Sequence, residues 1–352
     1  MIAAERRLIL KDKNNTSACS AKRTSIGGQA LIEGIMMRGP KISAMAVRNP
    51  EGQIVLEKWE NETSKRPQIL KWPLIRGIFN FVDSMRAGYK ALMRSAEIAG
   101  LEEETAEPSH EEPVLDAPKS KKTKEKKSDD KAPWYFNFVM ILSAVLGVLI
   151  AIVLFMYLPS QCYTWLTLAV PALEGQYLMR AVFEGVLRII LFVGYMAAVA
   201  MMKDIKRTFM YHGAEHKTIF CYEQGLPLTV ENVKNQRRFH PRCGTSFMIL
   251  MLIVSIVISM FIRFDNAFLR TGIKLLLIPL IVGIGYEMIK LAGRKDNIFT
   301  RIISAPGIWL QRISTKEPEE DEMIECAILA FLEVLPEEEQ AAERAKLESA
   351  EF

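Results

Sequence analysis

The stretch FNFVMILSAVLGVLIAIVLFMYL, residues 136–158, decides the kind of fold that this chain adopts. Its 23 residues include no charged side chain, and a helix that rises about 1.5 Å per residue crosses the hydrocarbon core of a bilayer over this length. Trp134 and Tyr135 precede the stretch, and aromatic side chains of this kind favour the membrane–water interface. The stretch therefore predicts a transmembrane helix.

Three later stretches are also apolar over most of their length, and we predict one span in each, at about residues 181–202, 247–262 and 273–291. The second of the four spans contains Glu184 and Arg188, which can pair because residues four apart share a helix face. Pro279 interrupts the fourth span. The chain is thus predicted to be a mainly α polytopic membrane protein with about four transmembrane helices.

The charged residues are segregated from the apolar ones. Half of the 352 residues are apolar and 24% are charged, and the net charge of +4 is too small to predict a specific nucleic-acid partner. Lys and Arg are abundant before the first span, in residues 203–245 and after the fourth span, and they are scarce in residues 159–180 and 263–272. The positive-inside rule then places both termini and residues 203–245 in the cytoplasm. We expect a multi-pass protein of the cytoplasmic membrane with the lipid bilayer as its first partner.

The segment before the first span combines strand and helix patterns. Two short strands are predicted at residues 43–48 and 53–58, because the sequence NPEG at residues 49–52 between them is a turn signal. Residues 69–100 present one apolar face, as an amphipathic helix does. We therefore predict a small α+β cytoplasmic domain at residues 23–100.

The same segment contains the glycine-rich stretch GGQALIEGIMMRGP at residues 27–40. Its four glycines predict backbone positions with a positive φ or a close approach of another chain segment. The stretch matches neither of the glycine patterns that bind nucleotides. Glu33 and Arg38 stand in an apolar context, and we expect them to form a structural pair.

The remaining soluble segments are highly charged. Residues 101–131 hold a run of acids and then a run of lysines, with too few apolar residues to form a core. Residues 321–335 predict a short amphipathic helix, and we expect the glutamate-rich tail beyond it to be disordered. The predicted segments are the flexible N-terminus 1–22, the α+β domain 23–100, the disordered linker 101–131, the membrane domain 132–315 with its cytoplasmic segment 203–245, and the C-terminal helix with its acidic tail 316–352.

The sequence YHGAEHK at residues 211–217 carries the clearest chemical signal. His212 and His216 lie four residues apart, so on a helix both imidazoles can reach one metal ion. Glu215 lies between them, which gives the H-x-x-E-H order of inverted zinc metallopeptidases, where the glutamate is the general base. We predict a divalent metal site of His212 and His216, for which Zn²⁺ fits best, with Glu215 as the catalytic residue.

A metal site needs at least three protein ligands, and the sequence offers three candidates to complete this one. The predicted topology brings the sequence HPRCGTS at residues 240–246 and the end of the fourth span to the same side of the membrane as the two histidines. Glu287 is the kind of ligand from a separate helix that an H-x-x-E-H hydrolase uses. His240 and Cys243 are equally open candidates, because their spacing allows both to reach one ion.

Each of these residues also has a structural interpretation. His212 and His216 suit interfacial histidines that bond to the backbone or to lipid phosphate. Glu287 can be a charged residue at a helix end, where charge is tolerated, and Cys243 can be a small residue buried for packing. His240 precedes a proline and suits a turn.

Five stretches are long enough to identify a family: GGQALIEGIMMRGP at 27–40, YHGAEHKTI at 211–219, HPRCGTSF at 240–247, GYEMIKLAGR at 285–294 and PGIWLQRISTKEP at 306–318. They resemble the YqhQ-like family, a bacterial family of unknown function that is described as predicted metal-dependent enzymes. The resemblance covers roughly residues 25–335, and Lys316 stands where the family form has Arg. It implies a polytopic bacterial membrane protein, and it supplies no reaction.

Two functions of different classes fit the sequence. The first is a membrane-embedded metal-dependent hydrolase with its site at the cytoplasmic membrane face, acting on a peptide or a lipid-linked group. The second is a non-catalytic membrane factor or scaffold that docks a translocon, ribosome or membrane-protein assembly partner at that face. A Glu215 side chain that points into a cavity beside both histidines favours the enzyme, whereas a salt bridge from Glu215 to Lys217 or to a distant arginine in a dry core favours the scaffold. A transport path along Glu184 and Arg188 is a third interpretation.

Overall fold

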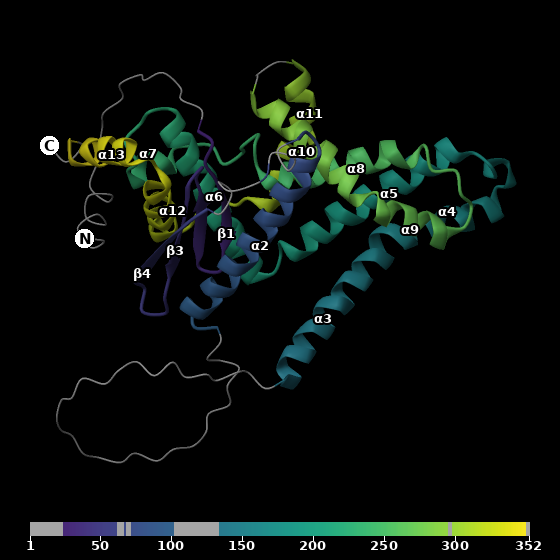
Figure 1. Ribbon diagram of the computed structural model, residues 1–352, viewed down its shortest axis with the longest axis horizontal. Coiled ribbons are helices and arrows are strands. Elements are labelled where there is room, and N and C mark those ends of the chain that lie inside the picture. The colour runs from purple at the N-terminus through teal and green to yellow at the C-terminus, as the bar shows by residue number, and fades with distance from the viewer. Residues whose placement is uncertain (1–23, 62–66, 68–71, 102–133, 295–297, 350–352) are drawn as a thin grey trace, which may run out of the picture.

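The computed structural model describes residues 24–61, 67, 72–101, 134–294 and 298–349. It consists of a small sheet with covering helices and of a group of apolar helices beside it (Figure 1). The prediction of a mainly helical chain with a small strand-containing N-terminal part is confirmed. The segments predicted as a flexible N-terminus and as a disordered linker fall almost wholly outside the described residues.

The sheet is an antiparallel meander in which each strand pairs with the next one along the chain. The predicted hairpin is confirmed, because the turn at 49–52 joins the last two strands. The glycine-rich stretch forms the first two strands, and the positive φ in its turn belongs to Glu33, at 49°. The strands are β1 (Gly27–Leu31), β2 (Gly34–Arg38), β3 (Ile42–Arg48) and β4 (Ile54–Glu60).

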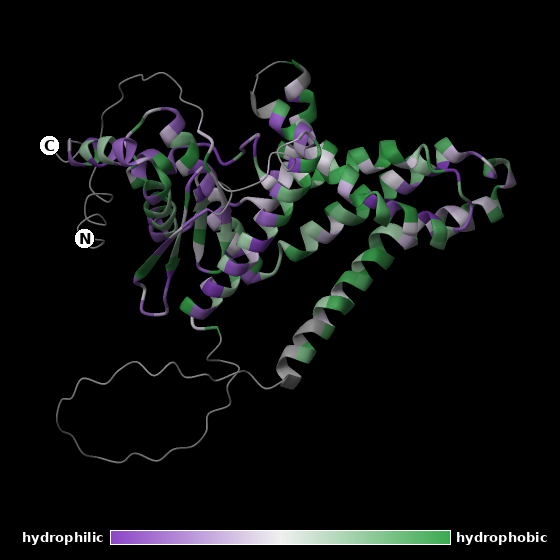
Figure 2. Ribbon diagram, in the orientation of Figure 1, coloured by the Kyte–Doolittle hydropathy of each residue, from purple (hydrophilic) through white to green (hydrophobic). Residues whose placement is uncertain are grey.

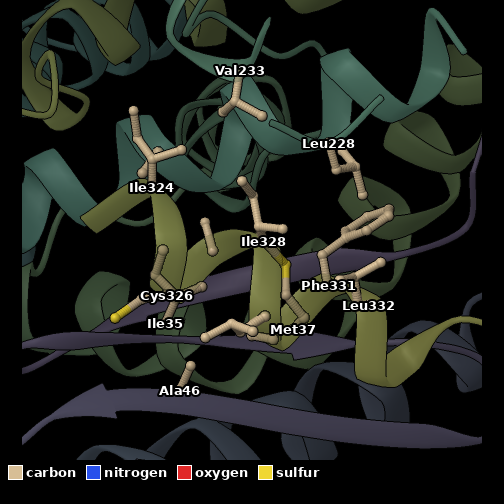
Figure 3. Packing of buried hydrophobic residues seen from close by; sticks show 14 of the residues in the cluster. Ile35, Met37, Ala46, Leu228, Val233, Ile324, Cys326, Ile328, Phe331 and Leu332 are labelled. Atoms are coloured by element: carbon tan, nitrogen blue, oxygen red, sulfur yellow. The ribbon is translucent and has the colours of Figure 1, made fainter. Parts of the chain in front are cut away.

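The main hydrophobic core lies between one face of the sheet and helices from distant parts of the chain. Helix α12 (Asp321–Val334) is buried along residues 323–332 and packs on β2 and β3 and on α6 (Lys203–Glu223). Figure 3 shows Ile328 and Phe331 between Met37 of the sheet and Leu228 and Val233, the latter on α7 (Val230–Lys234). The predicted amphipathic helix is therefore present, but it is a central element of the core.

Two further helices complete this part of the molecule. Helix α2 (Ile75–Ile98) covers the other face of the sheet, where Ala91 packs against Leu31 and Met45. Helix α13 (Glu337–Ser349) occupies the region predicted as a disordered tail, so that prediction is wrong for these residues. Three glutamates in its first turn complement the helix dipole, and Leu347 is buried in the core.

The apolar helices extend away from the sheet, and in Figure 2 most of their ribbon has the green colour of hydrophobic residues. Residues 142–150 of the first of them are exposed on all sides, as expected of a helix that faces lipid. The helices are α3 (Trp134–Ile152), which continues through the π-helical turn η4 (Val153–Tyr157) into α4 (Leu158–Ala169), then the short η5 (Pro171–Leu173), α5 (Tyr177–Val199), α8 (Gly244–Ser259), α9 (Ala267–Leu276), α10 (Ile278–Arg294) and α11 (Ile298–Ser314).

The number of predicted spans needs correction. Two helical stretches, Leu142–Ala169 and Tyr177–Val199, are long and apolar enough to cross a membrane, and α9 with α10 makes a third if this pair, bent by 49°, counts as one span. Helix α8 is apolar but shorter than a span of that length. Pro159 does not end the first apolar helix, because it lies in the first turn of α4, where a missing N–H is tolerated.

Two predicted ion pairs are replaced by other contacts. The carboxylate of Glu184 binds Arg180, Arg270 and Lys274, whereas Arg188 donates hydrogen bonds to the backbone oxygen of Phe155 and to Ser255 Oγ. Arg180 is also four residues from Glu184, on its other side, so the spacing alone could not choose between the two arginines.

Glu33 has no contact of the predicted kind with Arg38. The strand register pairs Arg38 with Gly27, at the opposite end of the hairpin from Glu33. Arg207 and Arg48 bind the Glu33 carboxylate instead, and Arg38 donates to Ser84 Oγ.

Candidate metal centre

Helix α6 carries both histidines of the motif on one buried face. Three residues separate it from the end of α5, and it packs against β1 and α12. The rings of His212 and His216 lie 4.5 Å apart between centroids, in an edge-to-face arrangement. The i, i+4 spacing therefore places the two imidazoles together, as the sequence predicted.

The outer nitrogen of each ring is held by a backbone carbonyl group. Nδ1 of His212 lies 2.9 Å from the carbonyl oxygen of Ser314, and Nδ1 of His216 lies 2.5 Å from that of Arg238. A carbonyl oxygen can only accept, so each Nδ1 carries a proton, and Nε2 is the nitrogen through which each ring can bind a metal once it is neutral. Histidines that bind metals are commonly held in this way.

Cys243 brings a third donor atom to the same place. It is the N-cap residue of α8, and its Sγ lies 3.2 Å from Nε2 of His212. One ligand atom from each of His212, His216 and Cys243 lies within 4.8 Å of the other two. Tetrahedral zinc holds such atoms roughly 3.5 Å apart, so a small inward movement of these side chains would close the group around an ion.

Glu215 lies beside this group and is 4% exposed. Its Oε1 accepts a 3.0 Å hydrogen bond from the backbone N–H of Gly28 on β1. Its Oε2 is buried and has no hydrogen-bond partner among the described residues. A buried carboxylate oxygen without a partner is costly, and it indicates a place for a proton, a water or a ligand.

A cavity of about 220 Å³ opens next to the cluster. Glu215, His216 and Cys243 form part of its wall, and the chain from Thr24 to Gly28 forms another part. Lys217 is turned away, because its Nζ binds the Lys234 carbonyl oxygen and the Glu317 carboxylate. Glu215 thus lines a cavity together with His216 and is not paired with Lys217.

The charges of the cluster are coupled. Burial alone would raise the pKa of the Cys243 thiol, but His212 and His216 hold that pKa well below its usual value. Burial alone would lower the pKa of His212, but Cys243 and Glu215 raise it to about 9. Burial raises the pKa of Glu215 more than the two histidines lower it.

His240 lies close to the cluster but outside the group of three. The centroid of its ring lies 5.6 Å from that of His216, in a tilted arrangement, and 4.9 Å from that of Phe220, in an edge-to-face arrangement. Its Nδ1 accepts from the backbone N–H of Arg242, and its backbone N and O both bond to the side chain of Gln311. Burial, with the neighbouring His216 and Arg242, lowers the pKa of His240 to about 2. The ring is thus a neutral wall of the cavity.

Glu287 has a different partner. Its carboxylate accepts two hydrogen bonds from the guanidinium of Arg76, and Nε of Arg76 lies 2.6 Å from its Oε1. This ion pair joins the start of α2 to α10, and Glu287 is absent from the group of metal-ligating atoms found in the described residues. Of the three candidates for the further ligand, the structure therefore brings Cys243 to the two histidines.

Two glycines that shape the site were not assigned to it from the sequence. A Cβ on Gly28 would lie 2.7 Å from Cδ of Glu215, so the bare backbone of β1 allows the carboxylate to approach. A Cβ on Gly213 would fall 1.9 Å from the carbonyl oxygen of Lys316. Lys316 lies two residues after Ser314, whose carbonyl oxygen accepts the hydrogen bond from His212. The available signal was that both glycines occur inside distinctive stretches, Gly28 in residues 27–40 and Gly213 in residues 211–219.

Comparison with known proteins identifies a family whose description names no reaction. The family described as "Protein of unknown function (DUF1385)" matches residues 72–337. The chain is 35% identical over 311 residues to "Uncharacterized protein YqhQ" of Bacillus subtilis (strain 168), covering 88% of this chain and 92% of that protein. No solved structure matches the chain.

Proposed function

The chain belongs to the family described as protein of unknown function (DUF1385), as its resemblance to the YqhQ-like family predicted, and we propose that it is a metal-dependent hydrolase. His212, His216 and Cys243 bind a divalent ion, Zn²⁺ first, and Glu215 is the general base. The observation that carries the proposal is the buried Oε2 of Glu215, which has no partner in the part of the chain that the structure describes and lies beside three donor atoms and a cavity.

The donor set and its surroundings suit zinc. Imidazole nitrogen and thiolate sulfur are ligands that zinc prefers, and three protein ligands leave one position open, as in catalytic sites. The carbonyl groups of Ser314 and Arg238 fix the histidine tautomers that bind metal. These contacts come from α11 and from the loop before α8, so three segments of the chain hold the site in shape.

The chemistry divides between the ion and the protein. A divalent ion here would polarise the bond to be cleaved and supply a reactive water near neutral pH. Glu215 would take the proton of that water and pass it to the leaving group, and the N–H of Gly28 keeps its carboxylate in place. The cavity of about 220 Å³ admits the end or the scissile bond of a peptide or a lipid-linked group.

Elemental analysis of the purified protein tests the metal. We expect about one zinc per chain, and its loss in His212→Ala, His216→Ala and Cys243→Ser. Cys221→Ser is the matched control, because Cys221 is also a buried free thiol, and among the described residues its Sγ hydrogen-bonds to the carbonyl groups of Leu226 and Pro227 and to no histidine. Equal metal content in the wild type and all three variants would contradict the proposed metal site.

Cobalt substitution separates a catalytic site from a structural one. A site with an open position binds azide and changes its visible spectrum, whereas a site closed by four protein ligands does not. We expect the azide-induced change in the wild type, and metal retention with an altered response in Glu215→Gln. A spectrum that is insensitive to azide would favour the non-catalytic factor that the sequence also allowed.

A thiol hydrolase is the second candidate, favoured by the 3.2 Å contact between Nε2 of His212 and Sγ of Cys243. Cys243 stands at the N-terminus of α8, where free N–H groups stabilise both a thiolate and an oxyanion. Rapid alkylation of Cys243 by iodoacetamide in metal-free native protein, lost in His212→Ala, would support it. Protection of Cys243 by bound zinc would support the metal centre.

We also propose that the site faces the cytoplasm and that both termini lie on that side. The basic residues of 203–245 and the scarcity of Lys and Arg in 159–180 support this orientation. Reporter fusions after Ser349 and within the loop at Glu174 test it, with activity of a cytoplasmic reporter expected only at Ser349. The reverse pattern would place the site on the outer surface.

A further inference from the structure

A second group of charged residues is buried among the apolar helices, away from the candidate metal centre. Glu184 on α5 accepts hydrogen bonds from Arg180 Nε at 3.1 Å, from Arg270 Nη1 at 3.2 Å and from Lys274 Nζ at 2.5 Å. All four side chains are at most 8% exposed. One carboxylate thus serves three cations.

Arg188 adds a fourth buried cation one helical turn further along α5. It is 4% exposed, and its Nη2 has no hydrogen-bond partner within the described part of the chain. Buried charges in a membrane protein are normally compensated, because an unpaired charge in an apolar medium is costly. The group therefore carries an excess of positive charge that calls for an anion.

A cavity of about 460 Å³ gives access to this group through Arg180. Its wall includes Tyr163 and Thr164 of α4 and Tyr177 of α5. Arg180 is 7% exposed, and among the described residues its Nη2 makes only long hydrogen bonds, of 3.4 Å to Ser160 Oγ and 3.3 Å to Thr164 Oγ1. Its Nη1 reaches Asp265 only at 3.8 Å, so the guanidinium has donors to spare on the cavity side.

The mouth of the cavity has the opposite charge. Asp265 and Glu174 belong to the loops at this end of the helices, and both line the cavity. Asp265 is 76% exposed on its side chain, and Glu174 is exposed as well. A ligand that enters thus meets carboxylates first and a guanidinium at the bottom.

We propose that this cavity binds a zwitterionic phosphodiester headgroup, phosphoethanolamine, of a membrane lipid. The phosphate accepts hydrogen bonds from Arg180 at the bottom and offsets the excess positive charge around Glu184. The ammonium group lies between Asp265 and Glu174 at the mouth. The exposed apolar surfaces of α4 and α5 next to the cavity, including Trp165 and Leu168, suit the acyl chains.

The charge pattern of the cavity predicts selectivity among lipid headgroups. An anionic phosphatidylglycerol headgroup would gain the contact with Arg180 but would face two carboxylates without a positive charge of its own. Phosphatidylcholine would keep both charges, but its quaternary ammonium cannot donate a hydrogen bond to either carboxylate. Phosphatidylethanolamine is therefore the lipid that satisfies both ends of the cavity.

Thermal stability of the detergent-solubilised protein with each of these three lipids added tests the site. We expect phosphatidylethanolamine to raise the Tm most in the wild type. The double variant Asp265→Asn/Glu174→Gln should bring its apparent affinity down about tenfold, to the level of phosphatidylglycerol. Asp204→Asn, which removes an exposed acid on α6, is the control and should change nothing. Arg180→Gln should reduce the rise in Tm that each of the three lipids causes. Arg180→Lys keeps the positive charge and should restore part of that rise, which a variant that fails to fold would not do.

Water-soluble glycerophosphoethanolamine distinguishes the source of the headgroup. Stabilisation by the lipid alone supports a membrane lipid as the ligand, and equal stabilisation by the soluble compound supports the same cavity with a free phosphodiester. Equal stabilisation of the wild type by all three lipids would overturn the proposal. An unchanged lipid preference in the Asp265→Asn/Glu174→Gln variant would overturn it as well.

Discussion

The backbone N–H of Gly28 donates a 3.0 Å hydrogen bond to Oε1 of Glu215, and 187 positions of sequence separate these two residues. Gly28 lies on the edge strand β1, and Glu215 lies on α6 between the two histidines of the candidate metal centre. The bond occupies one carboxylate oxygen and leaves the other buried without a partner among the described residues. The sheet is therefore part of the site and determines how the proposed general base is held.

The first prediction concerns this contact. In Gly28→Ala the new Cβ would lie 2.7 Å from Cδ of Glu215, so the buried carboxylate must move away. We expect a loss of roughly 1–3 kcal/mol in the free energy of unfolding, as for other overpacked sites, measured by denaturation of the solubilised protein. Gly27→Ala is the matched control, because a Cβ there meets no atom within 4 Å. Equal stability of the two variants would show that Glu215 is not held as described.

Local patterns in the sequence predicted the parts of the site that depend on one helix. The spacing of His212 and His216 places both rings on one face wherever a helix forms, because the period of the helix fixes it. The hairpin around residues 49–52 followed from its turn residues in the same way. The choice among Cys243, His240 and Glu287 depends on how α6, α8 and α10 pack together, and no local pattern records that.

The buried position of α12 could not be predicted for a related reason. Ile324, Ile328 and Phe331 predict one apolar face, but the helix is buried on its other faces too, because β2, β3 and α6 surround it. The partners of Glu184 and Glu33 likewise come from other segments, such as Arg270 and Arg207. Contacts between distant segments decide these features.

The second prediction concerns Gly213, next to His212 on α6. A Cβ there would fall 1.9 Å from the Lys316 carbonyl oxygen, so Gly213→Ala must displace the chain at residues 314–316. That chain holds Nδ1 of His212, and loss of a contact that orients a metal ligand typically changes metal affinity about 10- to 100-fold. We expect a loss of this size in a zinc competition titration with a chelator.

Gly244→Ala is the control for this experiment, because Gly244 adjoins Cys243 but a Cβ on it meets no atom within 4 Å. Its zinc affinity should equal that of the wild type. Wild-type affinity in Gly213→Ala would contradict the role assigned to the Ser314 carbonyl group.

The third prediction separates Glu287 from the metal. Because its carboxylate binds the guanidinium of Arg76, Glu287→Gln should leave the zinc content unchanged. A double-mutant cycle of Arg76→Ala and Glu287→Ala should give a coupling energy of roughly 1 kcal/mol, since the pair is bidentate but about a quarter exposed to solvent. Loss of zinc in Glu287→Gln would restore this carboxylate as a candidate ligand.

The fourth prediction concerns the pH dependence of stability near the start of α12. Hydrogen bonds from Arg207 and then Arg48 lower the pKa of Glu320 to about 2, below the usual value of 4.5. A carboxylate whose pKa is lower in the folded state stabilises it above pH 4.5, and this contribution is lost as the pH falls towards 2. At pH 7 we expect Glu320→Gln to lower the Tm by about 2 °C, because partial exposure of the three side chains screens their interaction.

The difference in Tm between the wild type and Glu320→Gln should be constant from pH 6 to 8 and should shrink below pH 4.5, because a protonated glutamic acid is as neutral as glutamine. Glu319→Gln is the matched control. It removes an exposed ion pair with Lys206, and such pairs contribute little to stability, so its Tm should follow that of the wild type. A Tm difference for Glu320→Gln that persists unchanged at pH 3 would mean that the carboxylate charge is not what stabilises this contact.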